Sequence, residues 1–143
     1  MSMTKQSSAS SGPVPESTRQ RLANLRRALL RLHKALLDDE RAAYERVHGR
    51  MSGGEMLQLV IHDEQFAWLR PVSELVVQID EMLDSDESAT TENARDLIAQ
   101  ARRLLAPSEE GQTFGKKYHS ALQREPSAVL AHREVTLILS ADV

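Results

Sequence analysis

Residues 22–36 read LANLRRALLRLHKAL. Leucines recur in this stretch at spacings of three and four residues, which places them on one face of an α-helix. The leucines of this face are Leu22, Leu25, Leu29, Leu32 and Leu36. Arginine and lysine side chains cover much of the remaining surface, so the pattern predicts an amphipathic helix that packs on a core. We expect this helix to run from residue 16 to residue 48, because Gly49 then supplies a stop.

Residues 52–84 predict a second long helix. Ser52 and Glu55 have the spacing of a capping box, in which each side chain bonds the backbone N–H of the other residue. Apolar residues continue at helical spacing beyond Pro71, so we expect a kink there rather than an end. Two helices of about 32 residues would each be about 48 Å long. They could therefore form a long antiparallel hairpin.

Three shorter helices complete the predicted fold. They cover residues 90–105, 109–123 and 126–139. Residues 135–139 are also compatible with a strand, but we favour a helix because no partner strand is visible elsewhere. The predicted fold is all-α, a four- to five-helix bundle built on the long antiparallel hairpin. Residues 15–143 form its single domain, and the polar residues 1–14 form a disordered N-terminal tail.

Composition restricts the class of protein. A length of 143 residues suits one domain, and the absence of cysteine excludes disulfides and thiolate metal sites. No apolar run approaches the ~20 residues of a membrane span, and no signal peptide is visible. We therefore expect a cytoplasmic protein that does not bind membranes.

Charge is distributed unevenly along the chain. Residues 1–50 carry 10 Lys and Arg against 5 Asp and Glu, whereas residues 51–99 carry 2 against 11. This difference favours packing of the basic first helix beside the acidic second segment. A nucleic-acid-binding domain would need a basic surface with stacking aromatic side chains. The net charge of −3 and the 3% aromatic content therefore argue against a nucleic-acid partner.

The apolar stripe predicted for residues 52–84 contains a carboxylate. Glu64 lies three residues after Ile61 and four before Trp68, so it shares their helix face. Burial of a carboxylate is costly without a partner, and Arg26 or His33 on the first helix could supply one. The stripe could instead reach solvent at this point, or Glu64 could line a polar pocket. The sequence leaves these alternatives open.

Residues 62–71 gather histidine, acidic residues, the only tryptophan and an arginine. Trp68 is either a core residue or the platform of a ligand site. Arg70 can bind an anion or a carboxylate, or it can form a surface ion pair with Glu74. If these residues form a ligand site, the candidates are His33, His62, Glu64, Trp68 and Arg70.

Metal and catalytic motifs are sparse. Di-iron helical bundles use two Glu-x-x-His motifs, and this chain has one such spacing, Glu45 with His48. We therefore expect no metal site and no cofactor, with Glu45 and His48 as the only candidate ligands. The chain has no phosphate-binding loop, and it has neither a nucleophile elbow nor the spacing of a triad. This favours a noncatalytic protein, although it does not exclude an enzyme.

Several segments together carry a family resemblance. These segments are residues 62–71, 73–75, 79–81, 114–118 and 126–132. They resemble small uncharacterised bacterial helical proteins over residues 20–135. The resemblance implies a bacterial origin, and it implies no activity because none is assigned to the group.

The unequal predicted helices and their long apolar stripes leave apolar surface that a second copy could cover. We therefore expect a noncatalytic interaction or regulatory module that forms a homo-oligomer, with a dimer favoured. One alternative is a sensor of a small molecule or anion, with a pocket around Glu64, Trp68 and Arg70. A second alternative is a helical metal-binding protein.

Overall fold

The computed structural model describes residues 13–85, 90–107 and 113–140. These residues form seven α-helices and no strand, which confirms the all-α fold class. The helices are α2 (Glu16–His48), α3 (Gly53–His62), α4 (Glu64–Ala67), α5 (Arg70–Asp84), α6 (Thr91–Leu104), α7 (Thr113–Arg124) and α8 (Pro126–Ser140). Residues 1–12 of the predicted tail and 109–112 of the predicted fourth helix lie outside this described part of the chain.

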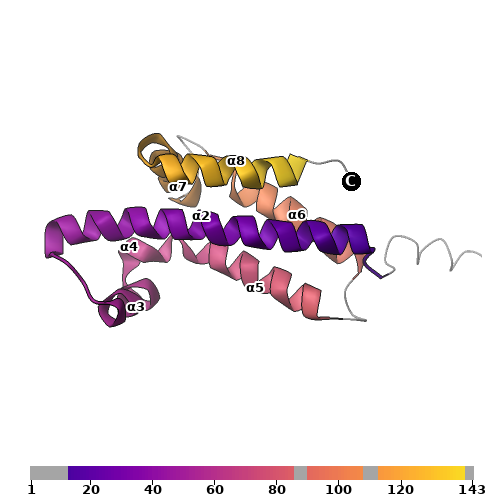
Figure 1. Ribbon diagram of the computed structural model, residues 1–143, viewed down its shortest axis with the longest axis horizontal. Coiled ribbons are helices and arrows are strands. Elements are labelled where there is room, and N and C mark those ends of the chain that lie inside the picture. Colours follow the sequence, from indigo (N-terminus) through magenta and orange to yellow (C-terminus); the bar gives the residue numbers. More distant parts are fainter. Residues whose placement is uncertain (1–12, 86–89, 108–112, 141–143) are drawn as a thin grey trace, which may run out of the picture.

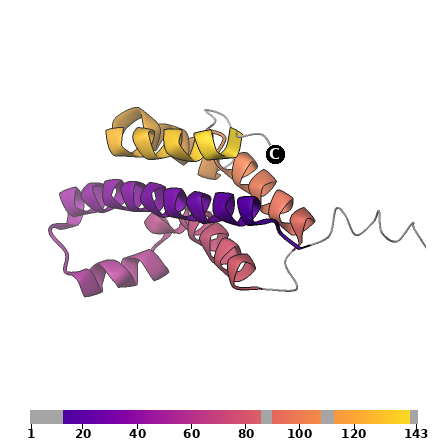
Figure 2. The ribbon, with the colours of Figure 1, turned by 45° about the vertical axis from the view of Figure 1, so that its right-hand side comes forward.

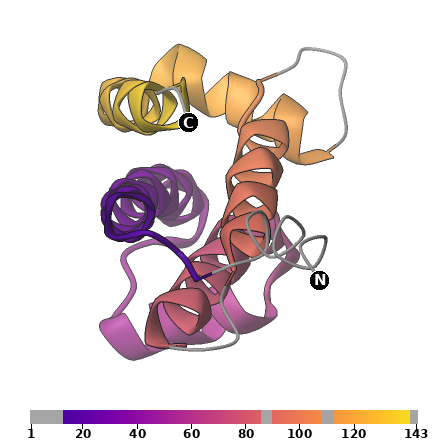
Figure 3. The same ribbon diagram turned by 90° about the vertical axis from the view of Figure 1, so that its right-hand side faces the viewer.

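Helix α2 is the central helix of the described structure. Figure 1 shows it running the length of the described structure, with α8 on one side and α4 and α5 on the other. All five leucines of the predicted face are fully buried. Seen nearly end-on in Figure 3, α2 lies below α8, and α6 runs beside both of them. The predicted four- to five-helix bundle with a hairpin of two long helices is not confirmed, because the described residues form seven helices and α2 is the one long helix among them.

The predicted second helix is broken into three. Helix α3 ends at His62, and Asp63 then adopts extended backbone dihedrals and caps α4 by accepting the Gln65 N–H at 2.8 Å. Trp68 and Leu69 form a turn before α5 begins. Pro71 lies in the first turn of α5, where its missing N–H breaks no helical hydrogen bond. The prediction of a kink at Pro71 is therefore wrong, because this proline begins a helix.

Helix α3 and the chain leading into it form a separate small layer. Figure 2 shows α3 diverging from α5 on the same side of α2. The capping box is confirmed, since Ser52 Oγ accepts the Glu55 N–H at 3.2 Å and Glu55 Oε1 accepts the Ser52 N–H at 2.9 Å. A small apolar cluster under this layer contains Met51, Met56 and Phe66.

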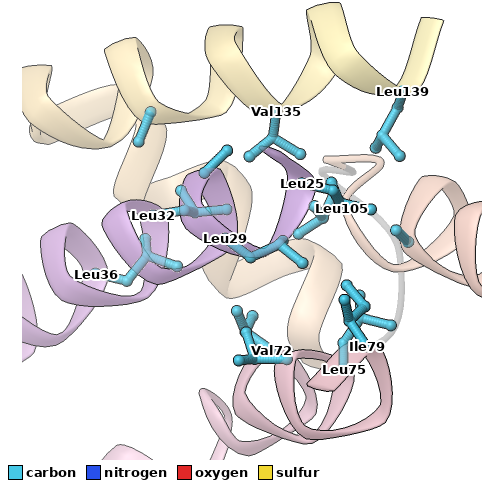
Figure 4. Packing of buried hydrophobic residues seen from close by; sticks show 14 of the residues in the cluster. Leu25, Leu29, Leu32, Leu36, Val72, Leu75, Ile79, Leu105, Val135 and Leu139 are labelled. Atoms are coloured by element: carbon cyan, nitrogen blue, oxygen red, sulfur yellow. The ribbon is translucent and has the colours of Figure 1, made fainter. Parts of the chain in front are cut away.

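The main core lies on both sides of α2. In Figure 4, Leu29 and Leu32 of α2 lie between Val72 of α5 and Val135 of α8. Val135 belongs to a continuous helix, so the strand considered for residues 135–139 is not formed. Ion pairs flank the core, and they join Arg26 to Asp80 on α5 and Arg31 to Glu134 on α8. The predicted packing of the basic first helix beside an acidic segment is therefore found where α2 meets α5.

Candidate functional site

The buried face of α2 ends in two carboxylates. Asp39 and Glu40 follow Leu36 by three and four residues, so they continue the leucine face. Asp39 is 9% exposed and Glu40 is 7% exposed. Buried carboxylates require hydrogen bonds or opposite charges, and the two residues obtain them from different elements.

Glu40 receives its hydrogen bonds from α4 and the turn that follows it. The indole Nε1–H of Trp68 donates to Glu40 Oε2 at 2.6 Å, and the side-chain amide of Gln65 donates to Glu40 Oε1 at 3.2 Å. Gln65 and Trp68 are three residues apart, so one helical turn presents both donors on the same side. Both donors are neutral, and Glu40 forms no ion pair with any described residue.

Asp39 obtains a charged partner from α7. Arg124 donates from Nε at 2.9 Å and from Nη2 at 2.6 Å, both to Asp39 Oδ2. A carboxylate that is nine-tenths buried is thereby matched by a guanidinium. This ion pair joins the last turn of α7 to the part of α2 that carries Glu40.

A hollow of about 480 Å³ opens beside Glu40. Its lining residues are Glu40, Gln65, Lys116, Lys117, Ser120 and Arg124. Lys116, Ser120 and Arg124 follow one another at four-residue spacing, so they lie on one face of α7. Neither lysine forms a hydrogen bond or ion pair with another described residue. The hollow therefore has a buried carboxylate on α2 and two exposed ammonium groups on α7.

A row of aromatic rings fixes α7 against its neighbours. The ring centroids of Trp68 and Phe114 are 5.4 Å apart, those of Phe114 and Tyr118 are 5.4 Å apart, and those of Tyr118 and His132 are 5.3 Å apart. Tyr118 Oη and His132 Nδ1 share a hydrogen bond of 2.5 Å. Burial raises the pKa of Tyr118 and lowers the pKa of His132. The row runs from the donor that binds Glu40, through α7, to α8.

Of the five residues predicted from sequence to form a ligand site, the structure places only Trp68 at this one. Glu64 is the first residue of α4 and is exposed, which agrees with the alternative that the stripe reaches solvent at this point and not with a buried ion pair. The break at Asp63 changes the helix register, which turns Glu64 to the surface. Arg26, considered as its partner, instead pairs with Asp80.

The other three predicted residues lie apart from the hollow. His62 is the exposed last residue of α3. The exposed guanidinium of Arg70 donates to the Ile61 carbonyl at 3.1 Å and so ties α5 to α3. His33 is half-buried on α2, where burial lowers its pKa, and it forms no hydrogen bond with a described residue.

Sequence reasoning missed most of the residues that line the hollow. A signal for one of them, Glu40, was present, because the spacing of the α2 leucines continues to Asp39 and Glu40. A polar residue at the end of such a stripe indicates a polar cluster inside the fold. No comparable signal marked Lys116, Lys117 or Ser120, because their proximity to α2 depends on how α7 packs.

The candidate metal ligands have local structural contacts. The Glu45 carboxylate accepts the Met51 N–H at 3.0 Å, which lowers its pKa, and it also accepts from Arg41. The His48 ring stacks on Tyr44 with centroids 4.1 Å apart. Within the described ranges, no group of three or more His, Asp or Glu residues is placed to hold a metal ion.

Comparison with known protein families, curated proteins and solved structures finds no match to this chain. In the part of the chain that the structure describes, no helix has the length and apolar character needed to cross a membrane.

A first prediction concerns the Trp68–Glu40 hydrogen bond. Trp68→Phe removes the indole donor and leaves a buried carboxylate oxygen without it, so we expect a loss of about 1–3 kcal/mol in the free energy of unfolding. Urea denaturation followed by circular dichroism measures the loss. When Glu40 is already replaced by leucine, the same Trp68→Phe change should lower the free energy of unfolding by about 0.5–3 kcal/mol less than it does in the unsubstituted protein. Additive losses would show that the hydrogen bond does not couple these residues.

A second prediction concerns pH. The unfolded chain binds a proton at the ordinary histidine pKa of about 6.5, whereas burial lowers the pKa of folded His132. The unfolded state therefore gains protons first, and stability falls as the pH drops from about 7 to about 5. Thermal unfolding across this range should show a smaller fall for His132→Gln than for the unsubstituted protein. The exposed His62→Gln is the matched control and should leave the slope unchanged; equal slopes in all three proteins would contradict the assignment.

Proposed function

We propose that this protein is a noncatalytic helical module that binds a small polar molecule in the hollow between α2, α4 and α7. The observation that carries the proposal is Glu40, a charged side chain that is 7% exposed and yet lines a hollow of about 480 Å³. Ligand sites in proteins commonly occupy about 300–1,000 Å³ and use a few fixed polar groups. Glu40 is such a group, because two hydrogen bonds hold its carboxylate in place.

The surrounding contacts favour binding over chemistry. Ser120 is the one hydroxyl among the residues that line the hollow, and it is hydrogen-bonded to no described histidine or carboxylate that could activate it. The walls of the hollow belong to α2, α4 and α7. Two other contacts hold these elements together, the Asp39–Arg124 ion pair and the Trp68–Phe114 ring contact. A bound molecule would add a contact between α7 and α2 and so stabilise their existing packing, which suits a sensor or regulatory module.

Native mass spectrometry of the untagged full chain, purified gently from cells, tests this proposal. We expect excess mass from a retained small molecule in the unsubstituted protein. The double substitution Lys116→Ala, Lys117→Ala should lose that mass, because it removes both unpaired ammonium groups from the hollow. Arg103→Ala removes one exposed charge from α6 and should retain it. A clean chain mass in every preparation, with no retained molecule, would count against binding at this hollow.

A second candidate function is self-association through α8. One face of this helix packs in the core, but Leu130 is 70% exposed and Leu137 is 63% exposed on the opposite side. They are seven residues apart, so they lie on one stripe, and Val129 at 43% exposure flanks it. A helix that is apolar on both faces is typical of one covered on both faces. A second copy of the chain would cover this stripe.

Light scattering with size-exclusion chromatography tests self-association. We expect a dimer for the unsubstituted protein and a monomer for Leu130→Lys, Leu137→Lys, because two charges would be buried at the interface. The control is Val47→Lys, which changes a side chain that is 77% exposed near the end of α2. A monomer at every concentration of the unsubstituted protein would exclude this interface.

A further inference from the structure

Resting on the proposed function, we infer that the molecule bound in the hollow is a small zwitterion whose amine lies on Glu40 and whose anionic group lies on Lys116 and Lys117. The inference deepens the proposal by naming the chemical class of the ligand. It follows from the distribution of charge around the hollow.

The two buried carboxylates of α2 differ in how their charge is compensated. Asp39 receives two hydrogen bonds from the guanidinium of Arg124. Glu40, one residue later and equally buried, receives hydrogen bonds only from a neutral indole and a neutral amide. Among the described residues no cation forms an ion pair with it. A buried charge without an opposite charge is costly, so a cationic ligand group at this position would relieve that cost.

Glu40 also retains the capacity to bind a further donor. A carboxylate has about four acceptor positions, and the two hydrogen bonds from Trp68 and Gln65 use one on each oxygen. The residue lines the hollow, and the inference places the ligand's donor at the open acceptor positions of its carboxylate. An ammonium group is a compact positive charge with three N–H donors. It would fill the open acceptor positions of Glu40 and neutralise the charge of its carboxylate.

The wall of the hollow that α7 forms is positively charged and requires an anionic group. Lys116 and Lys117 are exposed on α7 and line the same space as Glu40. Ser120 adds a hydroxyl one turn further along the same helix. Together these groups can bind a carboxylate or phosphate by charge and hydrogen bonds. A molecule with an amine at one end and an anionic group at the other would satisfy both walls.

Isothermal titration of the full chain with matched probes tests the inference. The zwitterions are glycine, 4-aminobutanoate and 6-aminohexanoate, and their single-charge partners are acetate and methylamine, butanoate and butylamine, and hexanoate and hexylamine. We expect one zwitterion, of the length that spans the hollow, to bind about 10-fold or more tightly than its single-charge partners. Native mass spectrometry with the same probe should show one molecule bound per chain.

Substitutions assign the two ends of the probe. Glu40→Gln keeps the shape of the side chain and an acceptor for Trp68, and it should weaken the zwitterion about 10-fold or more while leaving the simple anion unchanged. Lys116→Ala, Lys117→Ala should weaken both. If Glu40→Gln lowers stability too far for titration, the lysine variant still tests the anionic end. Glu92→Gln, an exposed acid on α6, is the matched control and should change neither affinity.

Three outcomes would overturn the inference. In the first, anion and zwitterion bind equally and Glu40→Gln has no effect, so the hollow binds a ligand without an amine. In the second, no probe binds; mass retained from cells would then preserve the proposed function while rejecting this ligand class. In the third, a lysine ammonium of the protein itself pairs with the Glu40 carboxylate in solution. Without ligand, Glu40→Gln and the lysine variant would then lower the free energy of unfolding by equal amounts, and zwitterions would bind no more tightly than simple anions.

Discussion

The leucine face of α2 must be covered on two sides, and the arrangement of the other helices follows from this. Leu29 and Leu32 lie between Val72 on α5 and Val135 on α8, so neither α5 nor α8 alone encloses the core. The same face continues into Asp39 and Glu40. Apolar side chains cannot cover two carboxylates without a large desolvation cost. The fold therefore places donors there, from α4 and its turn on one side and from α7 on the other.

The break in the chain at Asp63 makes the first set of donors possible. Asp63 ends α3 and caps the short helix α4. Because α4 is a separate turn, it presents Gln65 and Trp68 to Glu40 on one side while Glu64 faces solvent on the other. With this cap in place, Glu40 is the buried glutamate and Glu64 is the exposed one. The buried carboxylate belongs to the long helix α2, and the exposed one belongs to the short helix α4.

The aromatic row gives the second set of donors a fixed position. Tyr118 is fully buried between the rings of Phe114 and His132, so the register of α7 is set by packing at its centre. Arg124 lies near the end of the same helix and pairs with Asp39. The polar face of α7 is therefore presented to Glu40 by an apolar anchor and an ion pair. Charges held in this way need little reorganisation when a molecule binds between them, which is the physical advantage of a preorganised site.

The sequence by itself determined the elements whose signals are local. The leucine spacing fixed α2 from residue 16 to 48, the Ser52–Glu55 box fixed the start of α3, and Pro126 opened α8. At residues 135–139 the sequence favoured a helix without deciding against a strand, and the structure shows the helix. The break at Asp63 was missed because the apolar spacing continues through it, and a helix cap competes with that pattern only once α4 can pack against α2. Only the tertiary structure decided that Glu40 rather than Glu64 is buried and that Lys116 and Lys117 face it. Their meeting depends on contacts between helices that are distant in sequence, and neither spacing nor composition encodes how such helices cross.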